Sequence, residues 1–348
     1  MDKPKAEIQP LWIRITLAVL VVSVVLVVAG GYFWWTQEQP RKPAELTKLT
    51  FAISLNPIAS VGHIAFIKGF FKDEGLDVTL QFHTSGKASL NSVIERKANL
   101  ATVADTPLAH AGLNKESIYI LATIEDSVRS TAIVARKDKK ISEPGDLKGK
   151  KIGATIGSSG EFMLDTFLVL KNISREQVEI IDLKPEEMAD ALLTGKVDAV
   201  TTWPPYRFRA ENIIGHTTTT FFATGMYTET FNLAASRDFV DQNPETVKRI
   251  LRSAIKAEVF MRKNPDQSRA LIANHLKIDR SLIDELWKIL NFDVRLDQSL
   301  LTTLENQARW AIKNKHTDKT EVPNYLEFMF VDGLRAVRPD MVTVIGHK

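Results

Sequence analysis

The sequence of 348 residues contains no cysteine. This absence excludes disulfide bonds, thiolate-bound metals, a cysteine nucleophile and a lipid-modified N-terminal cysteine. An excess of one charge is also missing, because 45 Lys and Arg side chains stand against 42 Asp and Glu. A nucleic-acid-binding chain usually concentrates basic side chains on one face. We therefore expect no nucleic-acid partner.

The signature motifs of common enzymes are absent as well. The sequence has no P-loop spacing, no G-x-G-x-x-G after a predicted strand, no H-E-x-x-H and no G-x-S-x-G. Its seven histidines are scattered, and none pairs with another at the spacing of metal ligands. We expect no catalytic residue, no bound metal and no cofactor.

A long apolar run lies near the N-terminus. Residues 15–35 contain no charged side chain, and about 20 apolar residues suffice to cross the hydrocarbon core as a helix. Basic residues precede the run and aromatic residues end it, as is typical of a membrane–water boundary. A cleaved signal peptide is the alternative, although the apolar region of such peptides usually has about 7–15 residues.

This run predicts how the N-terminal part is organised. Residues 1–14 would be a cytoplasmic N-terminus, residues 15–35 a transmembrane anchor, and residues 36–47 a linker stiffened by Pro40 and Pro43. Residues 1–14 are too few to form a domain. We therefore expect a single-pass protein of the inner (cytoplasmic) membrane, with its body in the periplasm or extracytoplasmic space.

The rest of the chain alternates strand-like and helix-like segments in two runs, and it becomes mostly helical after residue 238. Such alternation is typical of βαβ units with parallel sheets. It predicts an α/β fold with two lobes. Residues 48–130 and 237–348 would form lobe 1, and residues 131–236 would form lobe 2.

Small polar residues gather where predicted strands turn into helices. Four such turns lie at residues 56–60, 84–86, 105–107 and 157–160. Ligands of α/β proteins bind at the carboxyl ends of strands, where free N–H groups of the next helix suit anionic or strongly polar groups. Any one turn could be only an N-cap, but four of them in two lobes favour a shared ligand site.

Aromatic residues follow another predicted strand, which ends at Thr202. Trp203 and Tyr206 stand there in the segment WPPY, and such rings form flat walls for a pocket. Packing in the core is the alternative. His63 lies near the start of its predicted helix, where it either faces the site or caps the turn, and the sequence leaves both readings open.

Four segments resemble one known family. GDLKGKKIGATIGSS (residues 145–159) resembles the opening of the second lobe in periplasmic binding proteins. KGFFKDEGLDVTL (68–80), LLTGKVDAVTTWPPY (192–206) and VPNYLEFMFVDGLRAVRPDMVTVI (322–345) are similar to segments of the nitrate/sulfonate/taurine-binding group. The resemblance covers nearly all of residues 48–345. Pro204 is a departure, because many relatives have an acidic residue there.

The resemblance implies a two-lobed periplasmic binding protein type II fold, in which two parallel or mixed sheets enclose a cleft. It implies a monomeric solute-binding component of an ABC importer that closes by hinge motion on a small polar or anionic molecule. Its partners would be the ABC permease and its ATPase, besides the membrane. The expected ligand-binding residues are Asn56, Ser60, His63, Asp105, Thr106, Ser130, Gly157, Ser158, Ser159, Trp203 and Tyr206.

Two other functions remain open at this point. The same fold hosts enzymes, such as a pyrimidine-precursor synthase and chorismate-derived dehydratases, but the synthase carries a cysteine cluster that this chain lacks. A ligand-sensing module for a partner kinase would use the same cleft. The ligand itself is not identified, because sulfonates, taurine, nitrate, bicarbonate and pyrimidines all suit a small polar cleft with an aromatic wall.

Overall fold

The computed structural model describes residues 10–37 and 45–346. The chain divides into two compact units, residues 1–45 and residues 46–348, and each is described by itself. The first unit holds one helix, α1 (Leu11–Gln37), of 27 residues. The predicted segments at residues 1–9 and at 38–44 of the linker lie outside the described residues.

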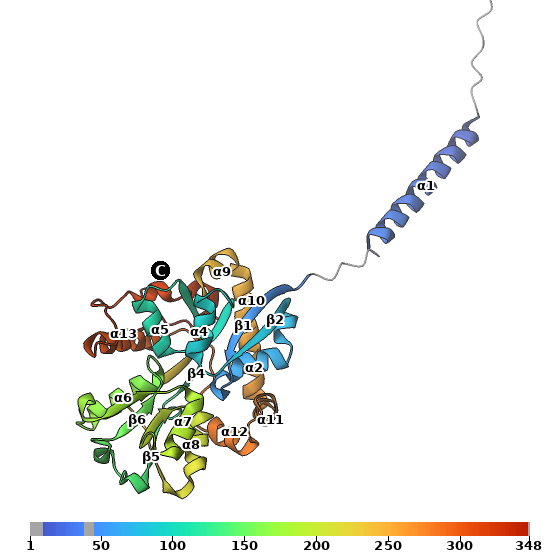
Figure 1. Ribbon diagram of the computed structural model, residues 1–348. Helices are drawn as coiled ribbons and strands as arrows, with labels where there is room; N and C mark the ends of the chain where they lie inside the picture. The colour runs from blue at the N-terminus through green and yellow to red at the C-terminus, as the bar shows by residue number, and fades with distance from the viewer. Residues whose placement is uncertain (1–9, 38–44, 347–348) are drawn as a thin grey trace, which may run out of the picture. The chain divides into compact units, whose positions relative to one another are not determined.

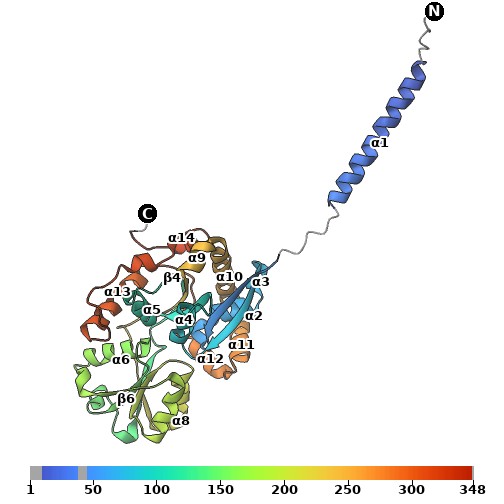
Figure 2. The ribbon, with the colours of Figure 1, turned by 45° about the horizontal axis from the view of Figure 1, so that its top comes forward.

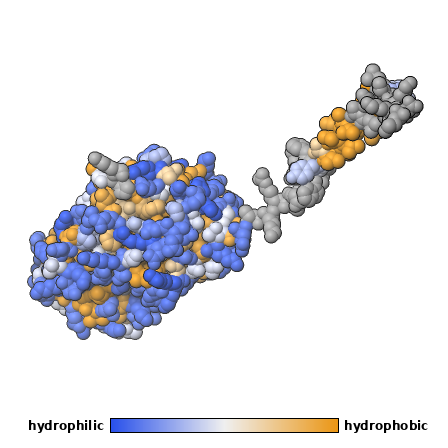
Figure 3. All heavy atoms as spheres, turned by 90° about the horizontal axis from the view of Figure 1, so that it is seen from above, coloured by the Kyte–Doolittle hydropathy of each residue, from blue (hydrophilic) through white to orange (hydrophobic). Residues whose placement is uncertain are grey.

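The predicted transmembrane anchor is not confirmed. Residues 15–35 are helical as expected, and apolar side chains such as Val21, Leu26 and Val27 are exposed along α1 (Figure 3). Within the described part of the chain, however, no helix has both the length and the apolar character needed to cross a membrane.

The second unit contains two five-stranded sheets (Figure 1). The first sheet has the strand order β2-β1-β3-β10-β4. Its strands are β1 (Thr47–Ser54), β2 (Leu76–His83), β3 (Leu100–Ala104), β4 (Ile118–Ser127) and β10 (Glu229–Ser236). Strand β1 pairs in parallel with β2 and β3, whereas β10 is antiparallel to β3 and β4. All five residues of β3 are buried, as expected for a strand covered on both faces.

The second sheet has the order β7-β6-β8-β5-β9. Its strands are β5 (Ala132–Arg136), β6 (Lys151–Ala154), β7 (Glu179–Asp182), β8 (Ala199–Thr202) and β9 (Thr218–Phe221). Strand β6 is parallel to β7 and β8, and β5 is antiparallel to β8 and β9. Each lobe is therefore an α/β unit with a mixed sheet.

Helices cover both sheets. The first lobe carries α2 (Ser60–Ile67), α3 (Phe70–Asp73), α4 (Gly86–Ile94), α5 (Asp105–Leu113), α9 (Arg237–Gln242), α10 (Pro244–Lys263), α11 (Pro265–Leu276), α12 (Arg280–Trp287), α13 (Gln298–Lys313) and α14 (Val331–Arg335). The second carries α6 (Ser159–Leu170), α7 (Met188–Thr194) and α8 (Tyr206–Ile214). In Figure 2 the labelled helices α2 to α5 and α9 to α14 gather in one lobe, and α6 and α8 lie in the other. The C-terminal helices thus belong to the first lobe.

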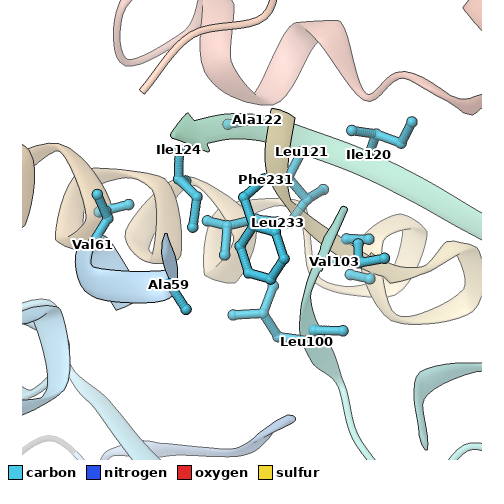
Figure 4. Packing of buried hydrophobic residues seen from close by; sticks show 14 of the residues in the cluster. Ala59, Val61, Leu100, Val103, Ile120, Leu121, Ala122, Ile124, Phe231 and Leu233 are labelled. Atoms are coloured by element: carbon cyan, nitrogen blue, oxygen red, sulfur yellow. The ribbon is translucent and has the colours of Figure 1, made fainter. Parts of the chain in front are cut away.

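A continuous apolar core lies around the first sheet. Strand β10 contributes Phe231 and Leu233, which pack near Leu100 and Val103 of β3 and near Ile124 of β4 (Figure 4). Each of these side chains is at most 2% exposed. Because β10 supplies the centre of this core, its position between β3 and β4 is fixed by burial of apolar surface.

Two segments connect the lobes. Residues 128–131 lead from β4 into β5, and residues 222–228 lead from β9 back into β10. The predicted boundary of lobe 2 at residue 236 is therefore wrong. Residues 229–236 are β10, and they pair within the first sheet because their apolar side chains are buried there.

Candidate functional site

A small cavity lies between the two lobes at the carboxyl ends of strands. Its volume is about 20 Å³, which is room for about one water molecule. Turns of both lobes contribute to its wall. The lining residues are Asn56, Ile58, Ser85, Gly86, Lys87, Ala104, Pro107, Ser158, Ser159, Trp203, Glu229 and Phe231.

The first lobe contributes two polar turns. Asn56 follows β1, and its side chain accepts a hydrogen bond of 3.0 Å from the Ile58 N–H. Ser85 caps α4 by accepting one of 3.2 Å from the Ala88 N–H. Both turns are N-caps, and both also line the cavity, so local capping and a place in the ligand site are compatible here.

The second lobe contributes the start of α6 and an aromatic ring. Ser158 caps α6 by accepting from the Gly160 N–H at 3.2 Å, and it donates to the Thr155 carbonyl at 2.6 Å. Trp203 follows β8 and is 5% exposed; its ring meets that of Tyr206 edge-on, with centroids 6.4 Å apart. A flat apolar wall therefore faces the polar turns.

Glu229, at the start of β10, brings a carboxylate into this site. Its Oε2 accepts hydrogen bonds from the hydroxyls of Ser130 at 2.9 Å and Thr131 at 2.7 Å. Its Oε1 accepts one from the Ser159 hydroxyl. The side chain thereby joins both connecting segments of the lobes to the N-terminus of α6.

A second carboxylate, Asp105, lies close by at the start of α5. It accepts hydrogen bonds from the Tyr227 hydroxyl at 2.5 Å and from the backbone N–H groups of Thr106 at 2.7 Å and Thr230 at 3.1 Å. Burial and, after it, the negative charge of Glu229 raise the pKa of Asp105 to about 6.

Glu125 on β4 belongs to the same acidic region. It is 1% exposed. Burial, followed by repulsion from Glu229 and Asp126, raises its pKa well above the ordinary value for Glu. An ionised carboxylate is therefore costly at this position.

The two lobes contact each other beside the cavity. Lys87 of α4 donates to the carbonyl of Ile156 in the second lobe at 2.7 Å. Tyr206 of α8 donates to the carbonyl of Thr84 in the first lobe at 3.1 Å. Farther along the interface, the Trp310 indole of α13 donates to Asp165 of α6 at 3.0 Å. These hydrogen bonds join the two lobes.

The expected site residues divide into three groups in the structure. Four of them line the cavity: Asn56, Ser158, Ser159 and Trp203. Five lie next to it: Asp105, Ser130, Gly157 and Tyr206 contact a lining residue or the opposite lobe, and Thr106 donates its N–H to Asp105. Two lie away from its lining: Ser60 and His63.

His63 shows why a helix start does not guarantee a place in the site. Its side chain is fully buried, with Nε2 3.0 Å from the Ser54 carbonyl and its ring packed near Phe82 and His275. Burial, then the neighbouring His275, lowers the pKa of His63 to about 3. The sequence left open whether His63 faces the site or caps its turn, and in the structure its ring packs against His275 of α11. Ser60 donates a hydrogen bond to the Pro57 carbonyl of its own turn.

Four lining residues lie outside the residues and turns that the sequence singled out: Lys87, Ala104, Glu229 and Phe231. A usable signal existed for Glu229, because it is the one charged residue in the otherwise uncharged stretch TETFNLAAS at residues 228–236. A charge at the end of an apolar strand indicates a polar environment there. No local pattern distinguishes Lys87 from other helix-start lysines.

Two larger hollows are also present. One of about 280 Å³ likewise lies between the lobes, and its lining includes Lys87 and Pro107 of the first lobe and Ile156 and Gly157 of the second. One of about 750 Å³ lies at the surface beside residues 318–324. We place the candidate site at the small cavity, because four of the expected site residues line it, whereas Gly157 is the one expected residue that lines the 280 Å³ hollow. Among the described residues no group of His, Asp and Glu could hold a metal ion.

Two sheets joined by two connecting segments, with the strand-end turns of both lobes meeting at one cavity, are the architecture of the periplasmic binding protein fold. Comparison with solved structures confirms this fold. The periplasmic aliphatic sulphonate binding protein SsuA from Escherichia coli aligns with a TM-score of 0.70 at 17% identity, over 82% of this chain and 98% of that chain. The desulfurization enzyme DSZB aligns with a TM-score of 0.58 at 17% identity, over 83% and 98%. The architecture is therefore shared by binding proteins and an enzyme.

The chain belongs to the NMT1/THI5 like family, whose family model matches residues 62–268. A putative aliphatic sulfonates-binding protein of Bacillus subtilis is 24% identical over 279 residues, which cover 78% of this chain and 81% of the relative. The taurine-binding periplasmic protein of Escherichia coli is 28% identical over 199 residues, covering 57% and 61%. Both relatives are named as binding proteins.

Proposed function

We propose that this chain is the solute-binding component of an ABC importer for a small polar or anionic molecule of the sulfonate and taurine class. One observation carries the proposal: the strand-end turns of two separate sheets converge on a single cavity that holds Trp203 and no catalytic motif. Such crevices are where α/β proteins bind ligands. The names of the relatives in Bacillus subtilis and Escherichia coli support the ligand class.

Hinge closure is the proposed mechanism. A cavity of about 20 Å³ is too small for a molecule of several heavy atoms, so a ligand would enter while the lobes are apart. The segments at residues 128–131 and 222–228 would take up the rotation. Ligand would then favour a form in which the lobes close around it, slightly farther apart than in this structure, because only such a form contacts it from both lobes. An ABC permease with its ATPase would sense the closed form.

The site assignment is tested by a thermal-shift screen of the purified full chain with taurine, alkanesulfonates, nitrate, bicarbonate and pyrimidines. A ligand at 100 times its dissociation constant adds about 2.7 kcal/mol to the free energy of unfolding. We expect Trp203→Ala to lose most of the shift that the best ligand gives. The matched control is Trp287→Ala, because Trp287 packs against Phe292 away from the cavity.

Trp287→Ala should lower the melting temperature without ligand and keep the ligand-induced shift. An equal shift in both variants would show that the ligand binds elsewhere. Turnover of any compound in the screen would favour the enzymatic alternative.

Membrane anchoring is a separate proposal, and it rests on the sequence. Residues 15–35 carry no charged side chain, although no described helix is long and apolar enough to span a membrane. The test is extraction of cell membranes with alkaline carbonate. Full-length chain should stay in the pellet, and a chain without residues 1–45 should be released. Release of both would remove the anchor from the proposal.

A further inference from the structure

The carboxylate of Glu229 faces the cavity, and a ligand that carries only negative charge does not account for it. The side chain lines the cavity and is 3% exposed. A negative charge held there repels a sulfonate or nitrate brought within a few ångströms, and burial strengthens the repulsion because the local dielectric is low. The cavity therefore calls for a ligand with a group that a carboxylate attracts.

The hydrogen bonds of Glu229 leave room for one more donor. Each carboxylate oxygen has about two lone-pair positions. Oε2 accepts from both Ser130 and Thr131, so its positions are used. Oε1 accepts from Ser159. One acceptor position on Oε1 is thus available, on the oxygen that reaches the lobe-2 residue Ser159 in the cavity wall.

The cavity also holds a charge of the opposite sign. Its charged lining residues are Glu229 and Lys87. Lys87 lies in the first turn of α4, beside the Ser85 cap, and it reaches across to the Ile156 carbonyl. A cation at a helix start favours an anionic group, whereas Glu229, with Asp105 coupled to it, favours a cation. A zwitterion matches both ends.

We infer that Glu229 is a specificity-determining residue that selects ligands bearing a protonated amine, the ligand's acidic group being directed toward Lys87 and the starts of α4 and α6. The inference rests on the proposed solute-binding function and narrows its ligand class to amino-sulfonates and similar zwitterions. Unsubstituted alkanesulfonates and nitrate are then poor ligands.

A purely structural role is the competing explanation. Glu229 follows the second connecting segment, and Ser130 and Thr131 belong to the first. The carboxylate could serve only to tie these segments together. A structural tie would affect stability, but it would not discriminate between two sulfonates that differ only in an amine.

Titration calorimetry of the full chain at pH 7 separates the two explanations. The probes are taurine, which has a sulfonate and an ammonium group, and ethanesulfonate, which has the same sulfonate without the amine. The proteins are the parent, Glu229→Gln and the control Glu245→Gln, which changes an exposed carboxylate paired with Lys248 on the surface. We expect the parent and the control to bind taurine at least tenfold more tightly than ethanesulfonate. Glu229→Gln should lose this preference.

The parent protein alone already tests the inference, even if Glu229→Gln folds poorly. Equal affinity of the parent for both probes would overturn it while leaving the solute-binding function intact. A preference for taurine that survives in Glu229→Gln would also overturn the inference. Binding of neither probe would refute the sulfonate and taurine class, and the inference with it.

Discussion

Buried carboxylates dominate the candidate site at the scale of single residues. Asp105 is fully buried and Glu229 is 3% exposed. Each is tolerated because hydroxyl and backbone donors surround it, such as Tyr227 at Asp105 and Thr131 at Glu229. Burial and the neighbouring Glu229 nevertheless disfavour ionisation of Asp105, which makes the stability of the molecule dependent on pH.

Asp105 gives a prediction with a definite sign. Its pKa is about 6 in the folded chain, against 3.8 ordinarily. Between these values the folded state keeps a proton that the unfolded chain has released, so stability falls as pH rises from about 4 to about 6. The free energy of unfolding of the parent minus that of Asp105→Asn should therefore decrease by about 2 kcal/mol between pH 4 and pH 7.

Urea unfolding at a series of pH values measures this difference. Asp190→Asn is the control, because Asp190 is exposed and paired only at the surface with Arg209. The free energy of unfolding of Asp190→Asn should depend on pH in the same way as that of the parent. A difference for Asp105→Asn that stays constant or grows with pH would contradict the burial of its carboxyl group as described.

At the scale of elements, the site depends on how closely helix starts approach the sheets. Helix α4 begins at Gly86, where an added Cβ would lie 2.9 Å from the Val103 Cα and 3.1 Å from the Phe231 ring. Only glycine allows this approach, which brings Ser85 and Lys87 to the cavity. The position of the polar turn at Ser85 therefore depends on how closely Gly86 packs against β3.

Gly86→Ala should destabilise the protein by about 1–3 kcal/mol, because the helix start must move away from the backbone of β3. It should also weaken binding of the best ligand, since Ser85 and Lys87 move with it. Gly145→Ala is the control, with open space around the added methyl group and only Glu143 within 4 Å. Denaturant unfolding and calorimetry measure both effects, and a Gly86→Ala protein as stable as the control would contradict the close approach.

At the scale of the whole molecule, some of the contacts that hold the two lobes together lie away from the cavity. The Trp310 indole N–H bonds to Asp165, and its ring packs on Phe162 with centroids 5.1 Å apart. Arg175 pairs with both Asp165 and Glu161 on the same helix. This group of residues joins α13 to α6 and so contributes to the contact between the lobes.

Trp310→Phe should shift the ligand-free protein toward an open form. The variant keeps an aromatic ring and loses one hydrogen bond to a charged group, a contribution of about 1.5–3 kcal/mol. Small-angle scattering should show a larger radius of gyration for Trp310→Phe than for the parent, and saturating ligand should reduce the difference. Trp287→Phe is the control, because Trp287 packs within the first lobe. Scattering profiles that coincide for all three proteins would show that this contact does not hold the lobes together.

The sequence predicted much of the fold and some of the residues that line the candidate site. Alternating strands and helices indicated two α/β lobes, and the polar turns at Asn56 and Ser158 were expected in the ligand site, where both line the cavity. His63 was left open between two readings, and Ser60 was placed at the site although it does not line the cavity. The direction of a side chain at a helix start depends on which helix packs against it, and α11 comes some two hundred residues later.

What the sequence determined by itself is local: the absence of cysteine, the order of strands and helices, and the polar turns between them. These follow from periodicity and turn chemistry among neighbouring residues. Only the tertiary structure decided that β10 returns to the first sheet and carries Glu229 into the cavity. That pairing joins segments more than a hundred residues apart, and it is set by burial of apolar surface across the whole lobe, which no local pattern encodes.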